Sequence, residues 1–185
     1  MIQQQYIDSF VSRLNPKFAD KISIGNNEFR IINKCDRSIN NQEGNLRDDN
    51  YLGREFEYTL KNEKLEIPIT IQLYENVSGH YRLFCYTKNN KMLSSFNLST
   101  GYNEGVIDIK LQIKVSTQKL TKEEREQKRD YILQRLEEEG LSILPKNIVY
   151  LGTYDPKDEV FIDTTPEKLM IDFLKICILK GDFNI

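Results

Sequence analysis

Asp108 and Lys110 lie two residues apart in Val106–Val115 (VIDIKLQIKV), a run in which apolar and polar residues alternate. Residues two apart in a β-strand share a face of the sheet, so this carboxylate and this ammonium group should project side by side. Such a pair can hold a divalent cation and steady a water molecule or a phosphate during phosphodiester hydrolysis. The pair can also be part of an ordinary solvated strand face, and this is the interpretation that we favour.

The segment after this run predicts a charged helix that carries Gln127-Lys-Arg-Asp-Tyr131. An acid-x-lysine strand followed by a helix with Gln-x-x-x-Tyr resembles the RecB-like branch of the PD-(D/E)XK nuclease family, and the resemblance covers about Phe96 to Tyr131. It implies Mg²⁺ or Mn²⁺ as cofactor and four site residues: Asp108, Lys110, Gln127 and Tyr131. The family has a further metal-binding carboxylate on the preceding strand, where this chain offers Asn97 and no aspartate. A divergent metal-dependent nuclease is therefore the alternative to a protein without catalytic activity.

Other residue combinations that support catalysis are missing from the sequence. His80 is the single histidine, which excludes a histidine-rich zinc site. The three cysteines, Cys35, Cys85 and Cys177, are far apart and have no metal-ligand spacing. No GxxxxGK(S/T), GxGxxG or GxSxG motif occurs, which argues against a nucleotide cofactor and against α/β-hydrolase chemistry. We therefore expect no cofactor, no metal and a binding function.

The strand expected at His80–Lys88 is the first candidate binding surface. Four of its residues share one face: Arg82, Phe84, Tyr86 and Lys88. Aromatic and basic side chains interleaved on a sheet can stack bases and contact phosphates. A helix can equally cover this face and bury Phe84 and Tyr86 in a second small core, which is the arrangement that we expect.

Arg37–Asn50 (RSINNQEGNLRDDN) is the second candidate surface. It is too polar to bury and rich in turn-forming residues, so it predicts a mobile surface loop. Arg37 and Arg47 are its candidate contact residues.

The overall charge limits the class of partner. The formal net charge of the 185 residues is −2, which argues against a generic, charge-driven nucleic-acid binder, although a local basic patch can survive this average. No signal peptide and no apolar stretch long enough to span a bilayer is present. With unpaired cysteines, these features favour a cytoplasmic protein with reduced thiols and no membrane partner.

Helices are predicted near both ends of the chain. Ile2–Leu14 repeats apolar residues at three- and four-residue spacing. The last helix begins at Thr165, with proline in its first turn, and stops at Gly181. It should be docked deeply, with a narrow polar stripe at Lys168, Asp172 and Lys175. A strongly charged, largely solvated helix is expected between Thr121 and Gly140.

The residues between these helices predict strands. The segments are Ile22–Ile24, Glu28–Ile32, Phe56–Leu60, Leu65–Leu73, His80–Lys88, Met92–Leu98, Val106–Val115, Asn147–Tyr154 and Glu159–Asp163. Pro68 favours an edge position or a bulge, because proline cannot donate to the ladder. Consecutive strands with one apolar face predict an antiparallel meander.

The sequence thus predicts a single α+β domain over residues 1–185. An antiparallel meander packs with N- and C-terminal helices, and one charged helix lies on the surface. The expected function is recognition of a protein or nucleic-acid partner within a larger assembly.

Overall fold

The computed structural model describes residues 13, 20–40, 52–75, 81–86, 92–103, 105–115 and 119–181. Side chains are described at 13, 20–32, 57–69, 105–115 and 119–181. Apart from Arg13, the predicted N-terminal helix Ile2–Leu14 lies outside the described residues.

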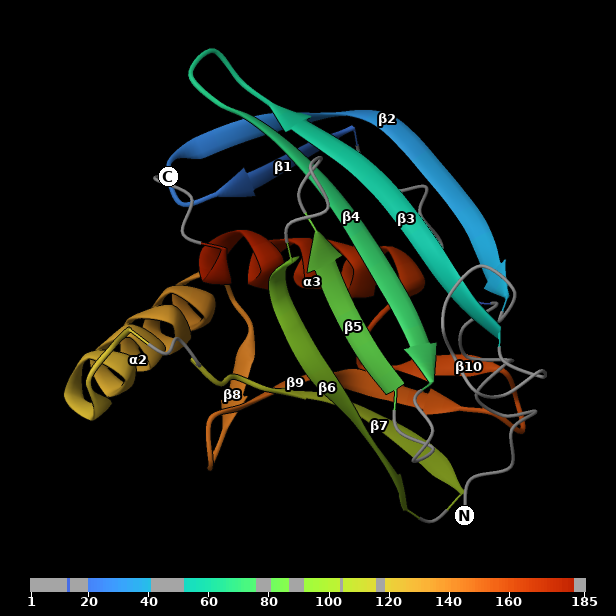
Figure 1. Ribbon diagram of the computed structural model, residues 1–185. Helices are drawn as coiled ribbons and strands as arrows, with labels where there is room; N and C mark the ends of the chain where they lie inside the picture. Colours follow the sequence, from blue (N-terminus) through green and yellow to red (C-terminus); the bar gives the residue numbers. More distant parts are fainter. Residues whose placement is uncertain are drawn as a thin grey trace.

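The described part of the chain forms ten strands and two helices (Figure 1). The strands are β1 (Lys21–Ile24), β2 (Asn27–Asn40), β3 (Leu52–Lys61), β4 (Glu66–Glu75), β5 (Tyr81–Tyr86), β6 (Met92–Asn103), β7 (Val106–Gln112), β8 (Ser142–Leu144), β9 (Ile148–Asp155) and β10 (Val160–Ile162). The helices are α2 (Lys122–Glu138) and α3 (Pro166–Lys180). The predicted α+β class is confirmed.

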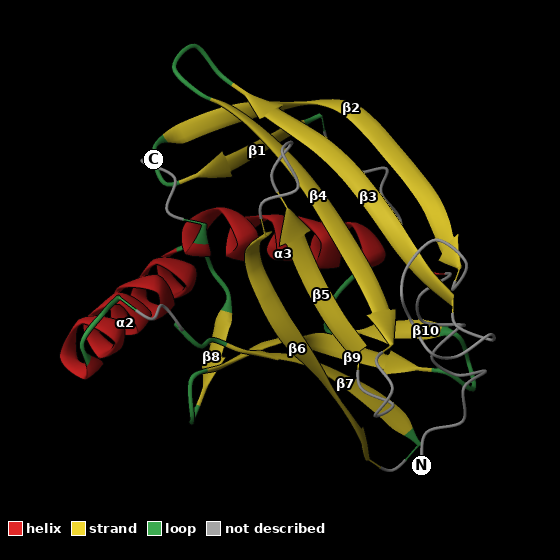
Figure 2. Cartoon of the chain, in the orientation of Figure 1, coloured by secondary structure: helices red, strands yellow, loops and turns green. Residues whose placement is uncertain are grey.

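All the strands belong to one antiparallel sheet with the order β1-β2-β3-β4-β5-β6-β7-β9-β10, and β8 pairs with β9 off this path. Strands β1 to β7 are neighbours in sequence order, so the predicted meander is correct. The sheet curves strongly, and α3 lies within its concave face (Figure 2). We call this concave side the inner face and the opposite side the outer face.

Helix α3 supplies much of the core. Thr165 is its N-cap, and the Thr165 side chain accepts a hydrogen bond of 3.1 Å from the backbone N–H of Lys168. Proline occupies the first turn and Gly181 is the C-cap, as predicted. Seven apolar side chains of α3 are fully buried: Leu169, Met170, Phe173, Leu174, Ile176, Cys177 and Ile178. A buried side chain of this size contributes about 1.5–3 kcal/mol, so the docking of α3 is a main source of stability.

The predicted polar stripe of α3 is wrong at Asp172, which is only 5% exposed. Its Oδ2 lies 2.6 Å from Nζ of Lys168, one helical turn away. Desolvation raises the pKa of Asp172, and the hydrogen bond and charge of Lys168 only partly oppose this effect. Periodicity places a residue on a helix face, but it does not tell how deeply that face is covered.

Helix α2 is the predicted charged surface helix. A complete capping box starts it: Glu124 N donates to Thr121 Oγ1 at 3.2 Å, and Thr121 N donates to Glu124 Oε2 at 2.7 Å. Only Ile132 and Leu136 of α2 are buried. The C-cap Glu139 docks the helix end, because its carboxylate accepts from Gly25 N in the β1–β2 turn and lies 3.4 Å from Nζ of Lys175 on α3.

Two strand predictions need correction. Arg37 to Asn40, predicted as loop, belong to β2, which continues past a bulge between Ile32 and Cys35 and pairs with β3. Main-chain pairing with β3 thus keeps polar residues in a strand. β8 was not predicted, since a three-residue strand leaves little periodicity to read. The rest of the predicted loop lies outside the described residues.

Pro68 lies on β4, which has β3 on one side and β5 on the other. It is therefore not on an edge strand of the sheet. The described register with β5 begins only at Thr70, so Pro68 occupies a part of β4 that is paired on one side within the described residues. The β5 positions that would lie opposite Pro68 are outside the described residues, so a local edge position stays a prediction.

Candidate functional site

The alternation of β7 places Asp108 and Lys110 side by side on the outer face. Ile107, Ile109 and Leu111 are fully buried on the inner face. Nζ of Lys110 lies 3.3 Å from Oδ2 of Asp108, and the two side chains are 31% and 24% exposed. The pair is therefore partly covered and already charge-compensated.

Strand β9 adds two hydroxyl groups to this pair. In the register Thr153 is opposite Asp108, and Tyr150 is opposite Lys110. Thr153 Oγ1 donates to Asp108 Oδ1 at 3.0 Å, and the Tyr150 hydroxyl lies 2.7 Å from Thr153 Oγ1. Because the Thr153 proton goes to the carboxylate, the Tyr150 O–H is the donor to Thr153. Tyr150 thus donates to Thr153, Thr153 donates to Asp108, and Lys110 pairs with Asp108. We call these four residues the outer network.

Gly152 makes the outer network possible. Residues 150 and 153 are three apart and would lie on opposite faces of a regular strand. The register shifts between Ile109 and Lys110, which are opposite Gly152 and Tyr150, so β9 has an extra residue at this point. Gly152 has a φ of +135°, and a Cβ there would lie 2.4 Å from Cγ2 of Thr164. A glycine inside an apolar strand is the sequence signal for such a bulge, which alternation alone does not predict.

The arrangement of the outer network is better suited to hydrogen bonding with a ligand than to catalysis. Both Asp108 oxygens are engaged, one by Thr153 and one by Lys110. Within the described residues no three His, Cys, Asp or Glu side chains are grouped so that they could hold a metal ion. The Lys110 ammonium has donors beyond its contact with Asp108, and the Tyr150 oxygen retains acceptor capacity.

Gln127 and Tyr131 lie on α2, apart from the outer network. Gln127 is exposed, and Tyr131 is 56% exposed. The Tyr131 hydroxyl accepts from Nη1 of Arg135 at 2.9 Å, and the Arg135 guanidinium lies 5.9 Å from the centre of the Tyr131 ring. No contact within the described part of the chain joins these two residues to Asp108 or Lys110. The structure therefore brings together only two of the four residues that the nuclease resemblance implies.

The backbone register extends the outer face to β5. Lys110 is opposite Ser99 on β6, and Asn97, two residues earlier, is opposite Arg82. The positions of Phe84 and Tyr86 follow at two-residue steps on β5. Three predicted binding residues thus share a sheet face with Asp108 and Lys110.

The remaining predicted contact residues are placed only in part. Arg37 is opposite Glu55 in the β2–β3 register. Lys88 and Arg47 lie outside the described residues.

The second small core expected over Phe84 and Tyr86 is not formed by either described helix. Helix α3 lies on the inner face, and α2 contacts α3 and β8 (Figure 1). The buried apolar side chains of α3 pack within the concave side, so of the described helices neither α2 nor α3 covers the outer face. The predicted N-terminal helix lies outside the described residues, so a second small core over Phe84 and Tyr86 stays a prediction.

No match to this chain was found among protein-family models, curated proteins or solved structures. Neither α2 nor α3, the helices of the described residues, has the length and apolar character needed to cross a membrane.

Proposed function

We propose that this protein is a non-catalytic recognition domain that binds a protein partner through the outer face of β4–β7 and β9, as part of a larger assembly. The supporting observation is the amino-acid composition of a group of neighbouring positions that the strand register places on the outer face. We call this set the outer patch: Thr70, Gln72, Tyr74, Arg82, Phe84, Tyr86, Ser95, Asn97, Ser99, Asp108, Lys110, Tyr150 and Thr153.

The outer patch is rich in aromatic, hydroxyl and amide residues and poor in charge. Arg82 and Lys110 are its cations, and Asp108 is its anion. Protein interfaces are enriched in tyrosine, phenylalanine and arginine and depleted in lysine and acidic residues, whereas nucleic-acid sites need many cations for the phosphates. Tyrosine, serine and asparagine together are also the side chains of antibody binding loops. This composition favours a protein partner over a nucleic acid.

The engagement of Asp108 supports the non-catalytic part of the proposal. Asp108 accepts from Thr153 through one oxygen and pairs with Lys110 through the other, so its carboxylate is held in place and its charge is balanced. The preorganised network is better suited to hold a fixed hydrogen-bonding surface. We also place the protein in the cytoplasm, because Cys177 is a free, buried thiol and the cysteine spacing favours a reducing compartment.

A photo-crosslinking experiment tests the proposal. A photoreactive residue replaces Phe84 in one version of the protein and Lys157, in the exposed β9–β10 turn, in the other. We expect one defined protein to be captured from cells through position 84 only, and the capture to be lost when Arg82→Glu and Lys110→Gln are added. Equal capture from both positions would refute the outer patch as a binding surface.

The same variants separate protein from nucleic-acid binding. We expect no binding of labelled single-stranded RNA or DNA at physiological salt, measured by fluorescence anisotropy. If the protein bound RNA tightly and Arg82→Glu abolished this binding, the partner of the outer patch would be a nucleic acid and not a protein.

A further inference from the structure

Strands β1, β2 and β3 carry three cations in one row across the sheet. Lys21 is directly opposite Arg30, and Arg30 is directly opposite Lys61. All three residues are exposed, while the alternate residues Ile22, Phe29 and Leu60 are buried. The row, which we call the cationic row, therefore lies on the outer face.

The two ends of the cationic row are neutralised and its centre is not. Nζ of Lys21 lies 2.9 Å from Oε1 of Glu28, and Nζ of Lys61 lies 3.2 Å from Oε2 of Glu66. Arg30 has no acidic partner among the described side chains. Like charges directly opposite one another destabilise a sheet. The central guanidinium is thus left available at a cost to the fold, and its fork of donors fits a carboxylate.

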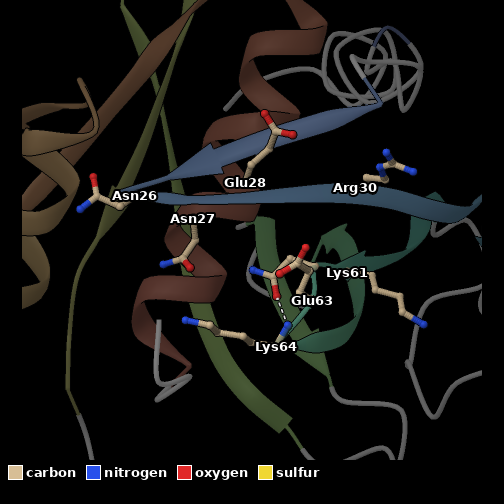
Figure 3. A pocket seen from close by; sticks show the side chains of 8 residues that line it. Asn26, Asn27, Glu28, Arg30, Lys61, Glu63 and Lys64 are labelled. Carbon is tan, nitrogen blue, oxygen red and sulfur yellow. Dashed lines mark hydrogen bonds between the residues drawn. The ribbon is translucent and has the colours of Figure 1, made fainter.

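An open pocket of about 620 Å³ adjoins the cationic row (Figure 3). Arg30, Lys61 and Lys64 are the cations of its wall, and Glu28 and Glu63 are the anions. Glu28 is paired with Lys21, so Glu63, in the β3–β4 turn, is the acidic side chain left to repel a bound carboxylate. That repulsion directs an incoming carboxylate away from the turn and toward Arg30.

Asn62 adds directed donors to the wall of this pocket. Its Oδ1 accepts from the backbone N–H groups of Lys64 at 2.9 Å and Leu65 at 2.8 Å. This leaves the amide NH₂ of Asn62 for a ligand. Every residue that lines the pocket has a polar or charged side chain, which suits a solvated peptide rather than an apolar small molecule.

An apolar contact lies next to the cationic row. Ile32 follows Arg30 by two residues on the outer face and is 38% exposed. It is opposite Thr59, which is in turn opposite Pro68. Positions two apart in an extended chain are about 7 Å apart, both in β2 and in a peptide lying along it. A carboxylate on Arg30 would thus place the side chain two residues further on over Ile32.

We propose that the cationic row is the docking site for an extended acidic segment of a partner protein, with one carboxylate held by Arg30 and an apolar side chain two residues away resting on Ile32. Charge complementarity carries the choice of an acidic segment, since the guanidinium of Arg30 lies between Lys21 and Lys61 and has no carboxylate of its own among the described side chains. The site is separate from the outer patch and stands whether or not that patch binds.

A fluorescein-labelled peptide with a Glu-Ser-Leu motif between Gly-Ser flanks tests the site by anisotropy at low salt. We expect the Arg30→Gln variant to bind it about tenfold more weakly, since a charge-assisted bidentate contact is lost. Ile32→Ser should weaken binding severalfold, and Arg30→Lys should lie between wild type and Arg30→Gln. Lys157→Gln, an exposed cation away from the row, should bind as wild type does.

Peptide controls distinguish the chemistry of the ligand. A Gln-Ser-Leu peptide should bind the wild-type protein as weakly as the Glu-Ser-Leu peptide binds Arg30→Gln. A Glu-Ser-Ser peptide should bind the wild-type protein as weakly as the Glu-Ser-Leu peptide binds Ile32→Ser. Equal binding of the glutamate and glutamine peptides would overturn the proposal. Competition by inorganic phosphate at the same concentration as the peptide would also overturn it, because the row would then be a simple anion site.

The ligand-free protein gives an independent check. Because Arg30 stands between two cations, we expect Arg30→Gln to raise the melting temperature by about 1–2 °C while it weakens binding. A purely structural arginine would show the opposite, a lower melting temperature with peptide affinity unchanged.

Discussion

At the scale of single residues, the outer network depends on Gly152, a residue that makes no side-chain contact itself. The bulge it permits brings Tyr150 and Thr153 to the face that carries Asp108. Alternation along β7 is visible in the sequence, and so the placement of Asp108 beside Lys110 could be predicted. The partners on β9 could not, because a bulge changes which residues share a face.

Gly152→Ala should lower the free energy of unfolding by about 3 kcal/mol. The new Cβ meets Thr164 at 2.4 Å, and the φ of +135° strains any residue with a side chain. Gly140→Ala is the matched control: its φ is +87°, but no atom lies within 4 Å of the added Cβ. It should lose only about 1 kcal/mol. Urea denaturation measures both, and equal losses would mean that steric contact at Gly152 is unimportant.

Asp108→Ala tests the nuclease alternative. We expect neither wild type nor variant to cleave labelled single- or double-stranded DNA or RNA with Mn²⁺, and no rise of the melting temperature on adding the metal. Metal-dependent cleavage that disappears in the variant would instead make Asp108 and Lys110 a catalytic pair.

Asp172 predicts a pH dependence of stability. Burial raises its pKa in the folded state above that of an unfolded carboxyl group, so folding favours the protonated acid. The contribution of Asp172 is fully favourable below the unfolded pKa, at about pH 4, and is lost as the pH rises through the folded pKa. Relative to Asp172→Asn, wild type should therefore lose stability as the pH rises above about 4. Melting curves across this range check it, and a constant difference would contradict it.

At the scale of elements, the C-terminal end of α2 is tied to two distant segments by one side chain. Glu139 accepts from Gly25 N in the β1–β2 turn and pairs with Lys175 of α3. The Lys175 and Glu139 side chains are only 17% and 12% exposed, so the pair is protected from solvent screening. Sequence periodicity defines α2 well, but it gives no sign of this three-way contact, which depends on how separate elements meet.

Glu139→Ala should cost about 2 kcal/mol, because it leaves a backbone donor and a nearly buried ammonium without their acceptor. Its neighbour provides the control. Glu138 is 56% exposed and lies 3.7 Å from Arg135, so Glu138→Ala should cost less than about 0.5 kcal/mol. Chemical denaturation of both variants measures the contrast, and similar losses would show that the three-way contact contributes nothing special.

At the scale of the whole molecule, alternation predicted most strands and their order, because strands joined by short turns pair with their neighbours. The curvature of the sheet and the pairing of β7 with β9 across α2 and β8 were not predicted. Alternation marks two faces of each strand without telling which is covered, so the sequence alone does not decide whether a helix lies over Phe84 and Tyr86. Likewise the cationic row could not be predicted from the sequence, since Lys21, Arg30 and Lys61 become neighbours only through the strand register.

The position of α3 in the chain bears on synthesis. Every described strand precedes α3, yet the inner face of the sheet is closed by α3. While the ribosome is still translating residues before Pro166, the curved apolar surface of the nascent strands lacks the helix that fills it in the described part of the chain. Folding must therefore wait until the segment of α3 has left the exit tunnel, and during that interval the chain is a natural client for chaperones. A stop codon shortly before α3 would make this exposure permanent and turn the product into a substrate for aggregation or proteolysis.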